Sequence, residues 1–381
     1  MNNFVFQNPT KLIFGKGTIA RLAREIPGDK TVMVTYGGGS VKKNGIYDQV
    51  TAALKNHRYI EFWGIEPNPS VETLRQAVAL GKEHHVDYLL AVGGGSVLDG
   101  TKLISVAIPY SGDAWELVLN AELLGDALPV ASVMTMPATG SEMNAGAVIS
   151  NKTTQEKFAF NYKHPQFAIL DPETTYSIPA FHIACGLADT FVHVMEQYMT
   201  TPDQSWLTDR WAEGILLNVV EIAPKIAENK HDYHLMSEYM LSATLALNGL
   251  ISMGVTQDWV THMIGHELTA IHGITHGQSL AIVLPATMTV LQAQKRGKIL
   301  QYGERVWGIT TGTPTERVLA AIDCTEQFFR SLNLATHLNE VQIGEETIAE
   351  VERRFNERKV ALGEACNVNG AIARAILEAC L

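Results

Sequence analysis

The sequence predicts an α/β domain followed by an all-helical domain. Up to about residue 175, short apolar runs that end in glycine or proline alternate with amphipathic stretches. Strands that alternate with helices are typical of a parallel sheet covered on both faces. From about Pro179 onward the apolar residues recur with the 3.6-residue period of helices instead. We therefore expect an N-terminal domain over residues 1–176 and a C-terminal domain over residues 177–381.

Four apolar runs in the first half predict buried strands, and an amphipathic stretch between them, VETLRQAVALGKEHH, predicts a helix. These runs are KTVMVTYGGGS at 30–40, VDYLLAVGGGS at 86–96, ALPVASVMTMPAT at 127–139 and FAILDP at 167–172. In the second half the predicted helices include WAEGILLNVVEIAPKIAE, MSEYMLSATLALNGLI, TERVLAAIDCTEQFFRSLN and AIARAILEACL.

Composition excludes several classes of protein. Hydrophobic residues make up 46% of the 381 residues and charged residues 18%, which suits a packed globular enzyme and not a disordered chain. A formal net charge of −11 and the lack of a basic block disfavour nucleic-acid binding. No apolar run approaches the roughly 20 residues that span a bilayer. Four scattered cysteines and the absence of a signal-peptide pattern favour the cytoplasm.

Two glycine-rich turns follow predicted strands. At residues 93–102, GGGSVLDGTK opens a predicted helix, where glycines let a phosphate approach the helix N-terminus. A simple strand-to-helix turn is the alternative, because the segment is neither a dinucleotide fingerprint nor a P-loop. At residues 37–43, GGGSVKK lacks the acidic side chain that often binds a ribose 2′-hydroxyl, and lysines follow. The turn favours NADP over NAD, with an ordinary surface turn as the alternative.

A third turn carries hydroxyl groups. The pattern T-x-x-x-T-G-S-E, which begins at Thr135 and includes Thr139, follows the strand predicted at 127–139. Small hydroxyl residues can donate to a pyrophosphate or line a nicotinamide pocket. They can equally be helix-capping residues.

Aspartate and histidine recur at helical spacing in the second half. Asp189 and His193 lie four residues apart, as do His262 and His266, and His276 follows a glycine-containing loop. Residues four apart share one helical face. One carboxylate with several imidazoles suits Zn²⁺ or Fe²⁺. Structural hydrogen bonds are the alternative for each pair, and the segment does not match the H-E-x-x-H pattern of zinc proteases.

Together these motifs resemble the iron-containing (group III) alcohol dehydrogenases over essentially the whole chain, and most closely their NADP-dependent butanol dehydrogenase and aldehyde reductase branch. The segments that carry the resemblance are PTKLIFGKG, EPNPS, GGGSVLDGTK, TMPATGSEMN, GLADTFVHVMEQY and THMIGHELTAIHGITHGQSLAIVLP. The resemblance implies a nucleotide-binding α/β domain before a helical metal-binding domain, the architecture also found in dehydroquinate synthases.

The resemblance also implies roles for individual residues. The family's metal ligands fall on Asp189, His193, His262 and His276. Its cofactor-binding positions fall on Asn68, Gly95, Ser96, Asp99, Thr135, Thr139 and Lys157. We expect Gly37, Gly38, Gly39, Ser40, Gly94 and Asn144 to contact the cofactor as well. The segment GGGS at 37–40 replaces the aspartate that NAD-using relatives carry, which strengthens the NADP expectation. His266 matches a histidine near the substrate and is either a proton relay or a residue that orients the pocket.

We therefore expect an enzyme that interconverts aldehydes and primary alcohols with NADP(H), in which one Fe²⁺ or Zn²⁺ polarises the substrate oxygen during hydride transfer. A homo-oligomer, most simply a dimer, is expected. Two other functions remain open. The first is a polyol dehydrogenase similar to glycerol dehydrogenases, which usually supply fewer histidines. The second is a nucleotide sensor that has lost its chemistry, although every expected ligand and glycine turn is present.

Overall fold

The computed structural model describes all residues from Met1 to Leu381. The chain forms two compact units. The sheet unit contains residues 7–178 together with residues 230–244, and the helical unit contains residues 1–6, 179–229 and 245–381. The expected fold class, a parallel α/β domain followed by a helical domain, is confirmed.

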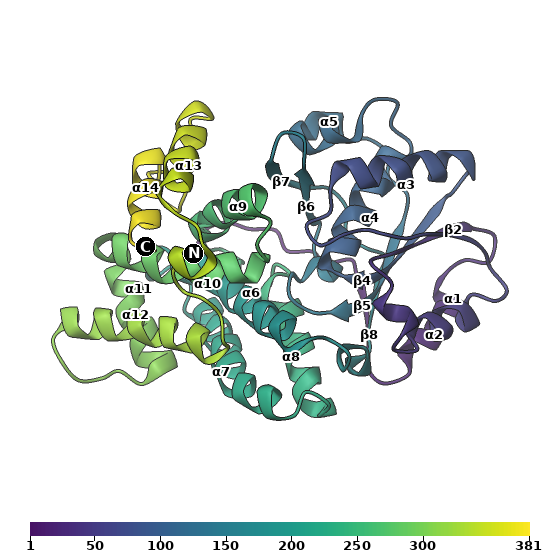
Figure 1. The fold of residues 1–381 in the computed structure, drawn as a ribbon. Coiled ribbons are helices and arrows are strands. Elements are labelled where there is room, and N and C mark those ends of the chain that lie inside the picture. Colours follow the sequence, from purple (N-terminus) through teal and green to yellow (C-terminus); the bar gives the residue numbers. More distant parts are fainter. The chain divides into compact units, whose positions relative to one another are not determined.

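The sheet unit is built on six parallel strands in the order β1-β8-β5-β4-β2-β3. Their bounds are β1 Lys11–Phe14, β2 Thr31–Tyr36, β3 Arg58–Phe62, β4 Tyr88–Gly94, β5 Val130–Met136 and β8 Phe167–Leu170. The helices of this unit are α1 Leu22–Glu25, α2 Ile46–Ala53, α3 Val71–Glu83, α4 Gly95–Ala107 and α5 Ala114–Leu119 (Figure 1). All four strands predicted from apolar runs are present.

Both faces of the sheet are buried, which explains why its strands are nearly continuous apolar runs. On β4, Leu89 and Ala91 belong to the core formed with α3, α4 and α5. Leu90 and Val92 point the other way, into the core formed with α1 and α2. Successive side chains of a strand alternate between faces, so each face of β4 receives every second residue.

Four further strands have no counterpart among the predicted runs. Strands β1 and β3 lie at the two edges of the sheet, where one side of each strand lacks a neighbour and exposed residues interrupt the apolar pattern. Strands β6 Gly146–Asn151 and β7 Glu156–Asn161 form a separate antiparallel hairpin that follows the T-x-x-x-T-G-S-E turn.

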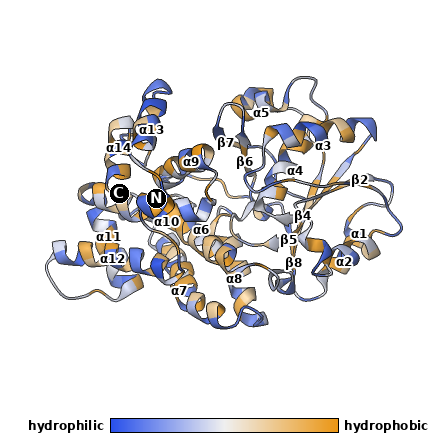
Figure 2. Cartoon of the chain, in the orientation of Figure 1, coloured by the Kyte–Doolittle hydropathy of each residue, from blue (hydrophilic) through white to orange (hydrophobic).

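Nine helices make up the second half of the chain, from α6 to α14. Their bounds are α6 Ala180–Tyr198, α7 Trp206–Glu228, α8 Tyr233–Ala246, α9 Val260–His272, α10 His276–Val290, α11 Gln292–Trp307, α12 Pro314–Ser331, α13 Glu345–Glu357 and α14 Gly370–Glu378. Helix α13 shows apolar and polar residues in alternation along its turns, as expected for a helix with one buried face (Figure 2). None of the helices is both long and apolar enough to cross a membrane.

Two segments pack with the unit that is more distant in sequence. Most of α8 packs with the sheet unit, where the Tyr239 hydroxyl donates to the carbonyl of Pro137 at 2.6 Å. The N-terminal residues 1–6 join the helical unit, where the Asn2 N–H donates to the carbonyl of Gly254 at 2.8 Å. In these two segments, the two compact units therefore do not follow the order of the sequence.

The buried strand β4 provides a test of the sheet core. Leu90 is fully buried, so Leu90→Ala is expected to lower the free energy of unfolding by about 2–5 kcal/mol through lost burial and the cavity left behind. Leu119→Ala is the control in the same unit, because Leu119 is 58% exposed, and it is expected to change stability by less than about 0.5 kcal/mol. Urea denaturation followed by circular dichroism measures both; equal losses would contradict the assignment of the core.

Candidate functional site

Helix α6 carries the first two predicted metal ligands on one face. Asp189 and His193 are one turn apart, and both are buried, with 3% and 5% of their surface exposed. The His193 Nδ1 atom lies 3.4 Å from Asp189 Oδ1. The prediction that this pair projects from one helical face is confirmed.

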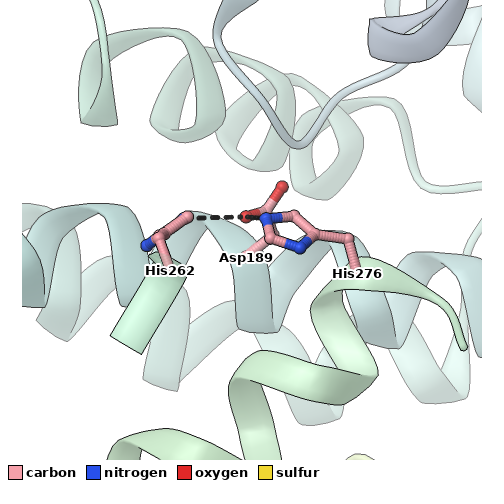
Figure 3. A group of neighbouring side chains, drawn as sticks. All are labelled: Asp189, His262 and His276. Carbon is pink, nitrogen blue, oxygen red and sulfur yellow. Dashed lines mark ion pairs between the residues drawn. The ribbon is translucent and has the colours of Figure 1, made fainter. Parts of the chain in front are cut away.

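The other two predicted ligands stand at helix beginnings. His262 lies in the first turn of α9, and His276 is the first residue of α10. The Nε2 atoms of His262 and His276 lie 3.6 and 3.9 Å from Asp189 Oδ1, the oxygen that His193 also faces. Figure 3 shows the side chains of Asp189, His262 and His276 pointing toward one another from three separate segments.

These distances suit a shared cation. The ligand atoms of Asp189, His262 and His276 all lie within 4.8 Å of one another. Two donors at about 2.1 Å from a tetrahedral metal are about 3.4 Å apart, close to the separations found here. The His193 Nδ1 and His262 Nε2 atoms are buried and make no hydrogen bond, so each is available as a ligand. One carboxylate and several imidazoles are also the donor types that Zn²⁺ and Fe²⁺ accept. The residues present therefore fit a divalent metal.

Burial favours the neutral state that a ligating imidazole needs. It lowers the pKa of His193 to about 4, against the opposing effect of the nearby Asp189 carboxylate. At His262, burial also lowers the pKa, but Asp189 and Glu196 together raise it more, so the balance is a raised pKa. A cation at this point would oppose protonation of both rings, because like charges repel.

His266 lies beside this group without belonging to it. It is buried, and its ring centroid is 5.1 Å from that of His276 and 6.3 Å from that of His262. The Trp259 ring also packs against His262, with ring centroids 5.1 Å apart, and against His193, with ring centroids 6.2 Å apart. Trp259 has φ 67°, a left-handed conformation that is rare for a bulky residue and is found where the surroundings impose it.

One residue of this cluster was not predicted from the sequence. The Glu196 carboxylate is buried and lies beside His262, with Oε1 3.2 Å from the ring Nδ1. Glu196 follows Asp189 by seven residues and His193 by three, which places all three on one face of a helix. That spacing was visible in the sequence, but glutamate at such a position is also ordinary on a solvated helix face.

In the sheet unit, the predicted nucleotide-binding turns lie at a topological switch point. Strand β2 leads to β3 on one side, whereas its neighbour β4 leads to β5 on the other. In open α/β sheets, ligands bind outside the carboxyl ends of strands at such a point. Residues 37–40 follow β2, and Gly95 begins α4 directly after β4. Both turns therefore stand where a nucleotide site is expected.

The turns approach each other closely. A Cβ atom on Gly95 would lie 2.5 Å from the Thr139 hydroxyl, and one on Gly37 would lie 3.5 Å from a Val97 methyl group. Asn68 also lies beside these turns, because its N–H donates to Ser96 Oγ at 3.3 Å and its Oδ1 accepts from Lys157 Nζ at 3.0 Å. Residues far apart in the sequence thus gather around the start of α4, and Thr135 lies near the carboxyl end of the adjacent β5.

Asp99 and Asn144 have structural partners in this region. The Asp99 carboxylate accepts from the Ser141 hydroxyl at 2.6 Å and from the Val148 N–H at 3.0 Å, and its burial raises its pKa. Asn144 Oδ1 accepts from the Gly146 N–H at 2.9 Å. Lys102, whose pKa burial lowers to about 8, donates to the carbonyls of Ser141, Asn144 and Gly146. These bonds fix the turn after β5, so any contact of Asp99 or Asn144 with a cofactor would come in addition to this role.

Comparison with known proteins covers the whole chain. Residues 9–172 match the iron-containing alcohol dehydrogenase family, and residues 183–378 match the C-terminal region of the Fe-containing alcohol dehydrogenase family. The NADPH-dependent aldehyde reductase YqhD of Escherichia coli is 50% identical over 100% of both chains, and the probable NADH-dependent butanol dehydrogenase 2 of Bacillus subtilis is 41% identical over 91% of both.

Solved structures agree with this assignment. The substrate- and cofactor-free form of the Escherichia coli enzyme has a TM-score of 0.92 at 48% identity, and covers 100% of both chains. The NADH-dependent butanol dehydrogenase A of Thermotoga maritima has a TM-score of 0.95 at 33% identity over 100% of this chain and 99% of that chain. With the buried Asp–His cluster and the glycine turns in place, the chain belongs to the iron-containing alcohol dehydrogenase family.

Proposed function

We propose that this protein is a metal-dependent oxidoreductase that reduces aldehydes with NADPH and oxidises primary alcohols in the reverse direction. The observation that carries the proposal is the convergence of Asp189, His262 and His276 on one buried point, with His193 facing the same oxygen. The 50% identical relative, an NADPH-dependent aldehyde reductase over its full length, supports this activity.

Asp189, His193, His262 and His276 would hold the divalent metal. When bound, the metal supplies Lewis acidity toward a substrate oxygen, and the nicotinamide supplies or accepts the hydride. The protein itself fixes the positions of the ligands and excludes water from them. All four come from helices, and Asp189, His193 and His262 are each at most 5% exposed. One carboxylate and three neutral imidazoles leave a net positive charge on a divalent cation, which suits developing negative charge on an oxygen.

The choice between NADPH and NADH cannot rest on the family, because the relatives differ. The 50% identical protein is NADPH-dependent, whereas the 41% identical one is described as NADH-dependent. The turn after β2 supports NADPH for this chain. It consists of three glycines and Ser40, with Lys42 and Lys43 following, and supplies no carboxylate. A carboxylate there would repel a 2′-phosphate, and the lysines would attract it.

His266 is proposed to relay a proton to or from the substrate oxygen. Its burial beside His262 and His276 places an imidazole next to the proposed metal ligands, and His266 itself is not proposed as a ligand. An imidazole exchanges protons near neutral pH, which this reaction requires in both directions. The alternative, that His266 only orients the pocket, predicts a smaller loss of rate when it is replaced.

We further propose that the protein forms a homodimer, lies in the cytoplasm and has a domain boundary between residues 176 and 177. Light scattering of the purified protein tests the homodimer. Limited proteolysis tests the boundary, and cell fractionation tests the location.

Replacing Asp189 tests the metal site. Asp189→Ala is expected to lose bound metal and NADPH-dependent aldehyde reduction together, because the shared carboxylate ligand is removed. Elemental analysis, NADPH absorbance with C2–C8 aldehydes, and circular dichroism measure metal, activity and fold. Thr190→Ala is the control, since Thr190 is buried on the same helix but donates only to the carbonyl of Gly186. Retained activity without metal in Asp189→Ala would defeat the proposal.

Replacing Gly38 tests the choice of nucleotide. A Cβ atom at Gly38 would meet no atom within 4 Å, so a side chain fits there. Gly38→Asp is expected to lower kcat/KM for NADPH relative to that for NADH on the order of 100-fold, through repulsion of the 2′-phosphate. Gly38→Asn, which has the same shape without the charge, should leave the ratio within a few-fold of the unmodified protein. Equal effects of Asp and Asn on both nucleotides would place the 2′-phosphate elsewhere.

Replacing His266 separates its two roles. For a proton relay, His266→Asn is expected to lower kcat on the order of 100-fold while bound metal stays unchanged. Steady-state kinetics and elemental analysis of the same preparation provide both quantities. A fall of only a few-fold in kcat would leave His266 as an orienting residue, and loss of metal would make it a ligand.

A further inference from the structure

Glu196 has no role in the reaction described so far, yet it lies within the metal-site cluster. It is 3% exposed and stands on the face of α6 that also carries Asp189 and His193. Carboxylates are rarely buried to this extent unless they have a specific partner. Its partner is His262, and the nature of their contact suggests what Glu196 does.

The contact has two points. Glu196 Oε1 accepts a hydrogen bond from the backbone N–H of His262 at 2.8 Å, and the same oxygen lies 3.2 Å from the ring Nδ1. One carboxylate oxygen therefore fixes both the backbone and the ring of the same residue. The opposite ring nitrogen, Nε2, then faces Asp189 Oδ1 at 3.6 Å.

We infer that Glu196 is a positioning residue that holds His262 with its proton on Nδ1, so that the Nε2 lone pair is directed to the metal. A neutral imidazole carries one N–H, and the hydrogen bond made by one nitrogen decides which nitrogen can ligate. Nδ1 beside a carboxylate oxygen is the donor, which leaves Nε2 as the ligand. This inference rests on the proposed metal-dependent function.

Neighbouring residues hold the backbone at Glu196 next to the start of α9. Its backbone carbonyl accepts from the Asp258 N–H at 2.8 Å, and the Asp258 carboxylate accepts from the Val260 N–H at 3.0 Å. Lys295 then donates to Asp258 Oδ2 at 2.5 Å and to the carbonyl of Met199, which follows the last residue of α6, at 2.8 Å. The end of α6 and the start of α9 are thus tied by several bonds, which limits the freedom of the Glu196 carboxylate.

A plain helix cap is the competing role. The first N–H groups of a helix have no partner within it, and a carboxylate at that end is favourable for this reason alone. A cap would affect only stability. A residue that orients His262 would also affect metal affinity and the position of the imidazole proton.

Two variants and a control distinguish these roles. Glu196→Gln keeps an acceptor oxygen, and Glu196→Ala removes it. Glu213→Gln is the control, because Glu213 is an equally buried glutamate of the helical unit that accepts from Tyr198 and arginines on α7 and α11. Zn²⁺ is titrated calorimetrically into each protein after chelation of its metal. Glu196→Ala is expected to weaken Zn²⁺ binding about 10–100-fold, Glu196→Gln less, and Glu213→Gln not at all.

A second measurement does not need the metal. Selective ¹⁵N labelling of histidine, with His262→Gln to assign the signal, shows by NMR which nitrogen of His262 carries the proton in the metal-free protein. At a pH alkaline enough for the His262 ring to be neutral, we expect the proton on Nδ1 in the unmodified protein and in Glu196→Gln, and a mixture of both positions in Glu196→Ala.

The outcomes separate this inference from the proposed function. A His262 proton on Nε2 in the unmodified protein, or unchanged Zn²⁺ affinity in Glu196→Ala with only a loss of stability, would overturn the role of Glu196. Failure of the unmodified protein to bind Zn²⁺ or Fe²⁺, with the proton still on Nδ1, would overturn the metal-dependent function and leave the Glu196–His262 contact standing.

Discussion

The helical unit is organised by the burial of two carboxylates on one face of a single helix. Asp189 and Glu196 are each 3% exposed on α6, and a carboxylate removed from water must be compensated by nearby positive charge or hydrogen-bond donors. Glu196 obtains its compensation from the N-terminus of α9 and the ring of His262. Asp189 is surrounded by imidazole nitrogens at 3.4 to 3.9 Å, and a divalent cation among them would supply the positive charge.

This requirement is met at the beginning of one neighbouring helix, α9. Helix α9 starts beside Glu196, where the His262 N–H of its first turn reaches the carboxylate, and that start brings the His262 ring opposite Asp189. Trp259, the residue before α9, takes a left-handed conformation to turn the chain there, and the Asp258–Lys295 pair holds that turn. Of the proposed metal ligands, His262 and His276 are therefore positioned by the beginnings of helices, whereas Asp189 and His193 lie within α6.

The sequence was most informative where the type of residue and its spacing along the chain point to the same element. The two-faced burial of β4 produced an apolar run that predicts a strand, and the spacing of Asp189 and His193 predicts one helical face. The edge strands β1 and β3 were not predicted, because exposed and half-buried residues interrupt their apolar pattern. The packing of α8 with the sheet unit could not be predicted either, because its buried Met240 joins the core of that unit and Tyr239 bonds to Pro137, and neither long-range contact changes the helical pattern of the sequence.

The same contrast applies within the site. Resemblance to a family points to the atoms that touch a ligand, because those residue types tolerate few replacements for a chemical reason. It does not point to Glu196, whose role depends on a distance of 3.2 Å to a ring on another helix. The nucleotide turns are the opposite case, since a Cβ atom on Gly95 would lie 2.5 Å from the Thr139 hydroxyl, so that only glycine fits there. The approach of these turns thus depends on the absence of a side chain at Gly95, whereas the proposed metal site depends on buried charges that are supported from another helix.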